Sequence, residues 1–150
     1  MGVDRSYVAR NDASRQRLAA RLDDLTANEL LTQVDADWTV GGLLAHLAFW
    51  DRRVMYVLDM TERDHKLFIP QLDIIINDLS LHLWAAIPPR EAARLAIEAC
   101  AAVDQRLEDF PTELLAEVYA HNPRWVVRAM HRDAHLDEVE AALRGRLIMH

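Results

Sequence analysis

The chain has 150 residues and a formal net charge of -7, and 51% of its residues are hydrophobic, with only four glycines and five prolines. This length suits a single domain, residues 1–150, and the composition favours a compact helical fold over disorder. The negative charge and the lack of a basic stripe argue against a nucleic-acid partner, because phosphate backbones would be repelled.

The lack of a recognisable membrane or signal segment and the use of cysteine predict a cytoplasmic protein. No stretch of the sequence approaches the roughly 18 apolar residues of a membrane helix, and the N-terminal residues lack the apolar core of a signal peptide. The single cysteine, Cys100, cannot form an internal disulfide, and its alanine neighbours predict a buried, inert thiol. We therefore expect a soluble, cytoplasmic protein with no membrane partner.

Hydrophobic spacing and capping residues predict four main helices, over residues 6–26, 39–60, 89–110 and 122–148. Thr39 and Asn122 are the expected N-caps of the second and fourth, and Pro89 favours the start of the third. Residues 72–86 are apolar enough to form a helix of their own or a broken part of the next one. On the last helix, Trp125, Leu136, Leu143 and Leu147 are expected to form a packing stripe.

Strand signals are missing, since the sequence has no alternating β-branched runs bounded by turns. The fold class that follows is all-α, a four-helix bundle. Residues 109–121 form a long loop for an up-down bundle, which predicts at least one long crossover connection.

Three histidines can meet at one metal ion. His131 and His135 are four residues apart, so on a helix they share one face, and His46 lies on the predicted second helix. Three neutral imidazoles leave a coordination position for water or substrate, which is typical of a catalytic site. The intervening Arg132 stands where a zinc peptidase of HExxH type needs its catalytic glutamate, so this spacing does not predict peptide hydrolysis.

These histidines also carry a family resemblance. The run Trp38-Thr39 followed by His46 resembles the opening of the second helix in the DinB-like superfamily, which includes the N-terminal domains of mycothiol-dependent maleylpyruvate isomerases. The last helix of that family carries a His-x-x-x-His or Glu-x-x-x-His pair, often with Gln or Glu three residues later, and here the residues are His131, His135 and Glu138.

The resemblance implies one divalent ion, commonly zinc or nickel, bound by His46, His131 and His135. Enzymatic relatives use such an ion with a low-molecular-weight thiol such as mycothiol, and many relatives form homodimers. Our first interpretation is therefore a metal-dependent enzyme that transfers or adds a thiol to an electrophilic small-molecule substrate. A metal-dependent hydrolase and a non-enzymatic, metal-stabilised stress or interaction protein are the alternatives.

Three further residues are candidates for the site. Glu138 follows His135 by three residues, so it could orient that ring, act as a catalytic base, or be a solvated charge. Arg53 could bind a substrate carboxylate and Trp50 could line the pocket, with a surface ion pair and a core aromatic as the simpler alternatives.

Overall fold

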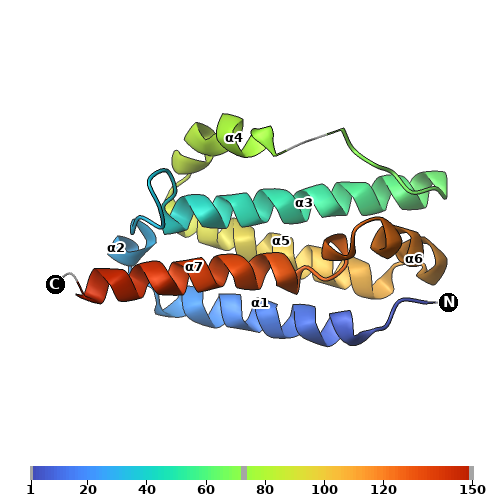
Figure 1. Cartoon of the computed structure of the whole chain (residues 1–150), viewed down its shortest axis with the longest axis horizontal. Coiled ribbons are helices and arrows are strands. Elements are labelled where there is room, and N and C mark those ends of the chain that lie inside the picture. Colours follow the sequence, from blue (N-terminus) through green and yellow to red (C-terminus); the bar gives the residue numbers. More distant parts are fainter. Residues whose placement is uncertain (1, 72–73, 149–150) are drawn as a thin grey trace.

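The computed structural model describes residues 2–71 and 74–148 of the chain (Figure 1). In these residues the only β pairing is an isolated bridge between Gln33 and Thr39, so the all-α prediction is confirmed. The helices in chain order are α1 (Ser6–Asp24), α2 (Ala27–Leu30), α3 (Val40–Asp64), α4 (Ile75–Ala85), α5 (Pro89–Asp109), α6 (Thr112–His121), the 3-10 helix η1 (Pro123–Trp125) and α7 (Ala129–Ile148).

Four long helices, α1, α3, α5 and α7, lie side by side along the molecule (Figure 1). Helix α3 packs most extensively on α5, while α1 contacts both α5 and α7, and α7 also contacts α3. Figure 1 shows α3 and α5 running in the same direction, with α4 on the outer side of α3. The two histidine-bearing helices, α3 and α7, are therefore neighbours.

Residues 109–121 are mostly helical, which corrects the predicted long loop. Helix α6 begins after Pro111 and buries Leu115 and Val118 against the core. Two buried residues in a segment of ten give too short a pattern for periodicity to distinguish it from a loop. The sequence analysis also did not predict α2, because its four residues are too few to show a helical period.

The fourth helix starts later than predicted. The side chain of Asn122 does cap a helix, accepting from Arg124 N at 3.0 Å, but this helix is only the 3-10 turn η1. Helix α7 starts at Ala129, whose N–H donates to Asn11 Oδ1 of α1 at 2.9 Å. A contact from a distant helix thus sets this start. Trp125 consequently precedes α7, and the side chain of Leu147 lies outside the described residues.

The start of α3 agrees with the prediction. Thr39 Oγ1 accepts from Gly42 N at 3.0 Å, and the helix continues to Asp64, four residues beyond the predicted end. Gly41 permits close packing here, because an added Cβ would lie 3.1 Å from Pro89 Cβ at the start of α5.

The core consists of two apolar halves with a polar layer between them. One half includes Leu18, Leu44 and Leu136, and the other includes Tyr7, Leu58 and Leu107. All four long helices carry buried polar residues near the junction of these two halves, and this layer includes Asn11, Ser14, Asp51, Asp104 and Arg132.

Helix α4 is the least buried of the helices above ten residues. Its predicted start at Leu72 lies outside the described residues, and Ile75, Leu79 and Leu83 are exposed on it. None of the helices in the described part of the chain is both long and apolar enough to cross a membrane.

Candidate metal centre and adjacent cavity

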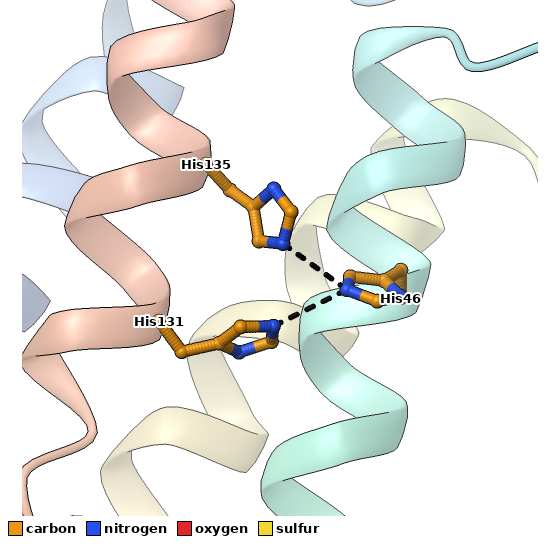
Figure 2. A group of neighbouring side chains, drawn as sticks. All are labelled: His46, His131 and His135. Atoms are coloured by element: carbon orange, nitrogen blue, oxygen red, sulfur yellow. Dashed lines mark hydrogen bonds between the residues drawn. The ribbon is translucent and has the colours of Figure 1, made fainter. Parts of the chain in front are cut away.

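The three predicted histidines meet between α3 and α7. His46 comes from the buried N-terminal half of α3, and His131 and His135 come from successive turns of α7 (Figure 2). Nε2 of His46 lies 3.2 Å from Nε2 of His131 and 3.2 Å from Nε2 of His135. Among the described residues these three form the group of side chains placed to hold a metal ion, with one ligand atom each.

These separations suit metal coordination. Two nitrogens each about 2.0–2.1 Å from a tetrahedral zinc ion lie about 3.3 Å apart, and neighbouring ligands of an octahedral ion at similar bond lengths lie about 3.0 Å apart. The observed 3.2 Å falls between the two values, so the donor set fits zinc or nickel without choosing between them.

The surroundings of the rings keep two of them neutral. Burial, with a smaller contribution from repulsion by His135, lowers the pKa of His46 to about 3. The apolar surroundings include Trp38 and Trp84, whose ring centroids lie 5.3 and 5.6 Å from that of His46. Burial and the neighbouring Arg128 cation also lower the pKa of His131. A neutral imidazole has the free lone pair that a metal ion needs.

Neighbouring side chains determine the proton positions on the α7 histidines. Oε2 of Glu138 lies 3.2 Å from Nδ1 of His135; a carboxylate only accepts, so the neutral form of this ring donates from Nδ1 and has a lone pair at Nε2. Nη2 of Arg128 lies 3.2 Å from Nδ1 of His131; a guanidinium only donates, so this ring accepts at Nδ1 and carries its proton on Nε2.

His46 cannot satisfy both neighbours while all three rings are neutral. If its Nε2 accepts from His131, two lone pairs face each other across the contact with His135. If its Nε2 carries the proton instead, two N–H groups face each other across the contact with His131. A cation among the three Nε2 atoms removes this conflict, provided that the proton of His131 is on Nδ1. Binding an ion therefore requires Arg128 to give up this hydrogen bond.

The polar layer fixes α7 next to the other helices. Arg132, 1% exposed at its side chain, pairs with both oxygens of Asp104 on α5, at 2.9 and 2.6 Å. Arg128 donates from Nε to Asp51 on α3 at 2.8 Å. Arg132 also donates to Ser14 Oγ on α1 at 3.2 Å. These bonds fix the chain at Arg128 and at Arg132, and His131 lies between these two residues in the sequence.

A cavity of about 560 Å³ opens beside the histidines, a size within the range of small-molecule sites. The three histidines form part of its wall, so a bound ion would be accessible from it. The remaining described lining residues are Trp50, Arg53, Val54, Ile74, Asn77, Asn122, Arg124, Trp125 and Arg128.

Both predicted pocket residues line this cavity. The indole N–H of Trp50 donates to Asn77 Oδ1 at 2.8 Å, which ties α3 to α4. The guanidinium of Arg53 lies over Trp50 and over Trp125, 5.0 and 5.2 Å from the ring centroids. Trp50 is only partly buried and lines the cavity, so the simpler alternative of a core aromatic does not describe it.

Sequence reasoning missed two arginines that precede α7. Arg128 and Arg124 line the cavity, and neither was a candidate. A signal was present in α3, where Asp51 occupies a position of the apolar stripe between Leu47 and Val54. A lone carboxylate at such a position predicts a buried cation on a facing helix.

The fold and the site define an all-helical protein with a candidate three-histidine metal centre at the edge of a cavity. The chain belongs to the DinB superfamily, whose family model matches residues 10–139. This match confirms the resemblance seen in the sequence motifs. No curated protein and no solved structure matches the chain significantly.

Proposed function

We propose that this protein is a divalent-metal-dependent enzyme with the DinB-type four-helix bundle and its long crossover connection, and that it transfers or adds a small-molecule thiol to an electrophilic substrate. The observation that carries the proposal is the convergence of three Nε2 atoms, two of the pairs 3.2 Å apart, at the wall of a 560 Å³ cavity. A structural ion would be expected in a closed site with four protein ligands.

His46, His131 and His135 would hold the ion, which we expect to be zinc or nickel. Such an ion supplies Lewis acidity, which favours the thiolate form of a thiol at neutral pH. The remaining lining residues would hold and orient the small molecules, and the indoles of Trp50 and Trp125 would limit the access of water.

The chain offers no suitable sulfur of its own. Cys100 is fully buried on α5, its thiol donates to Ile97 O at 3.2 Å, and burial raises its pKa to about 11. A buried thiol that resists ionisation is a poor nucleophile and a poor ligand. The proposal therefore requires a soluble thiol, such as mycothiol, as the second substrate.

Glu138 has two proposed roles at this centre. As an orienting residue it fixes the tautomer of His135 by accepting from Nδ1, which serves thiol transfer or hydrolysis equally. As a base it would assist a metal-activated water in a hydrolase. The contact with His135 supports the orienting role, and we place thiol transfer first because enzymatic members of the family use a thiol.

The test is consumption of a fluorogenic haloalkyl electrophile by purified protein loaded with zinc or nickel, with and without added thiol. The His131→Ala/His135→Ala variant removes two ligands, and His82→Ala, at an exposed position of α4, controls for loss of a histidine. We expect thiol-dependent turnover in the wild type and in His82→Ala, and background rates in the double variant.

Two outcomes would contradict the proposal. Turnover of an ester or amide without thiol would assign the site to hydrolysis. Metal-independent turnover that survives the double histidine substitution would show that the three-histidine centre takes no part in the reaction.

A further inference from the structure

Three of the four tryptophans in the chain surround His46. The ring centroid of His46 lies 5.3 Å from that of Trp38, 5.6 Å from that of Trp84 and 6.3 Å from that of Trp50. The first two indoles are nearly perpendicular to the imidazole, at 75° and 74°, and contact each other at 5.8 Å. We call these three indoles the aromatic box. They enclose a residue that is only 6% exposed.

Each indole of the aromatic box is held by a different element. Trp38 precedes α3, and its backbone N–H donates to Asp35 Oδ1 at 2.9 Å. Trp50 belongs to α3, and its indole N–H donates to Asn77 Oδ1 on α4. Trp84 is one of the two residues buried on α4. The aromatic box therefore depends on the packing of α4 against α3.

The three histidines differ at Nδ1, the ring nitrogen that is not shared with the centre. Nδ1 of His135 contacts Glu138, and Nδ1 of His131 contacts Arg128. Nδ1 of His46 is buried and has no hydrogen-bond partner among the described residues. A metal-bound histidine usually donates its second ring N–H to an acceptor, and this bond orients the ring. His46 therefore needs a different kind of support.

Asn77 is the polar side chain that could give this support. Burial lowers the pKa of His46, and Asn77 offsets part of this fall, so the two side chains interact. Asn77 does not bond to Nδ1, however, and its oxygen already accepts from Trp50 Nε1 at 2.8 Å. Asn77 thus holds a member of the aromatic box more directly than it holds His46.

We propose that the aromatic box positions His46, directing its Nε2 toward α7 in place of a hydrogen-bond acceptor at Nδ1. Perpendicular packing of aromatic rings is favourable beyond the burial of their surface, and it restricts rotation of the enclosed ring. Figure 2 shows Nε2 of His46 directed toward both histidines of α7. Trp38 and Trp84 act as positioning residues, because neither is among the described residues that line the cavity.

The aromatic box also changes what His46 supplies to an ion. An acceptor at Nδ1 increases the basicity of the coordinating nitrogen, whereas an aromatic face accepts an N–H only weakly. His46 is therefore expected to be the weakest donor of the three, which leaves a bound ion more Lewis acidic. This deepens the proposed function and rests on it only for the use of that acidity. The positioning itself requires only that the three histidines bind an ion.

Zinc affinity of the full-length protein, measured by calorimetry, tests the positioning. Trp38→Leu and Trp84→Leu should each raise the Kd for zinc by about tenfold, the usual effect of losing a group that orients a ligand. The matched control is Trp125→Leu, because Trp125 is as buried as Trp84 and packs on Arg53 and His121 instead. It should change the Kd by less than about twofold.

The conservative variants Trp38→Phe and Trp84→Phe keep an aromatic ring and should retain most of the affinity, within about threefold of the wild type. Thermal unfolding identifies the variants that fold. If Trp84→Leu does not fold, Trp38→Leu decides the test, because Trp38 is only partly buried.

Nuclear magnetic resonance of the zinc-loaded protein gives a readout that a loss of stability alone would not change. Long-range proton–nitrogen correlation detects Nδ1 through the carbon-bound protons of the ring, and hydrogen bonding moves a protonated nitrogen downfield. Nδ1 of His46 should therefore lie upfield of Nδ1 of His135, which donates to Glu138. Trp38→Phe should shift the signal of His46 and leave that of His135 in place.

Several results would overturn the inference. They are an unchanged Kd for zinc in the folded Trp38→Leu and Trp84→Leu variants, an equal rise in Trp125→Leu, and Nδ1 of His46 downfield of Nδ1 of His135. A larger loss of affinity in Asn77→Leu than in either indole variant would assign the orienting role to the amide instead.

The same proteins separate this inference from the proposed function. A wild type that binds zinc but shows no thiol-dependent turnover, together with weakened zinc binding in Trp38→Leu, contradicts the proposed function alone. Thiol-dependent turnover with zinc affinities that ignore the aromatic box contradicts this inference alone. A wild type that binds no zinc contradicts the three-histidine centre, and the positioning role with it.

Discussion

Replacing Arg132 by methionine should destabilise the protein strongly, because it removes one partner of a buried ion pair. The guanidinium is 1% exposed and pairs with both carboxylate oxygens of Asp104, which is 5% exposed. Burial raises the pKa of Asp104 even with Arg132 alongside it, which shows how costly an isolated charge is at this position. Arg15 remains 3.1 Å from the carboxylate and would compensate only in part.

The expected loss in Arg132→Met is about 3–5 kcal/mol of unfolding free energy, the usual cost of breaking a buried pair. For a domain of this size this corresponds to a fall in Tm of about 6–20 °C. Replacing both partners, in Arg132→Met/Asp104→Leu, removes the two charges together. The double variant should therefore be more stable than Arg132→Met alone.

Urea unfolding, followed by circular dichroism, measures the unfolding free energy of the wild type, of Arg132→Met and of Arg132→Met/Asp104→Leu. Arg94→Met is the control, because Arg94 forms exposed ion pairs with Glu91 and Glu98, and its midpoint should stay close to that of the wild type. If Arg132→Met unfolds at the same urea concentration as Arg94→Met, or if the double variant is the least stable of the set, the polar layer does not stabilise the fold in the way described.

Three other predictions concern the site. In chelator-treated protein the pKa of His46 is about 3 when folded and about 6.5 when unfolded, so the unfolded state binds the additional proton and stability falls as the pH drops through this window. This ring alone should cost about 2 kcal/mol on going from pH 7.5 to pH 5, and equal stabilities at the two pH values by urea unfolding would mean that the ring is not buried in neutral form. Cys100→Ala should keep its thiol-dependent turnover, and a complete loss of activity in a folded variant would show that the protein uses its own sulfur. Glu138→Ala should weaken zinc binding by about tenfold in calorimetric titration, with Glu138→Gln less affected because an amide oxygen can still accept from Nδ1 of His135; unchanged affinity in both variants would leave Glu138 as a solvated charge.

The pair of His131 and His135 was predictable because it depends on local periodicity, while the family resemblance linked His46 to this pair. A spacing of four residues places His131 and His135 on one helix face wherever the helix begins, so the late start of α7 at Ala129 did not affect it. The caps at Thr39 and Asn122 were also local, since each side chain bonds to a backbone N–H two or three residues ahead.

The rest depended on contacts between distant parts of the chain. Asn11 fixes the start of α7 from a position 118 residues earlier in sequence, and no local pattern encodes that pairing. The cavity is formed by side chains from α3, α4, η1 and α7, so the arginines that line it could be recognised only once these elements were placed together. Asp51 carried a partial signal, as a charge at an apolar position.

The central claim is that His46, His131 and His135 bind one divalent ion, and metal content tests it most directly. Protein purified without a histidine tag is equilibrated with zinc or nickel, desalted and analysed for metal per chain, alongside His131→Ala/His135→Ala and the control His82→Ala. We expect one ion per chain in the wild type and in His82→Ala, and none in the double variant. A wild-type protein that retains no ion, or a folded double variant that retains as much as the wild type, would contradict the three-histidine centre.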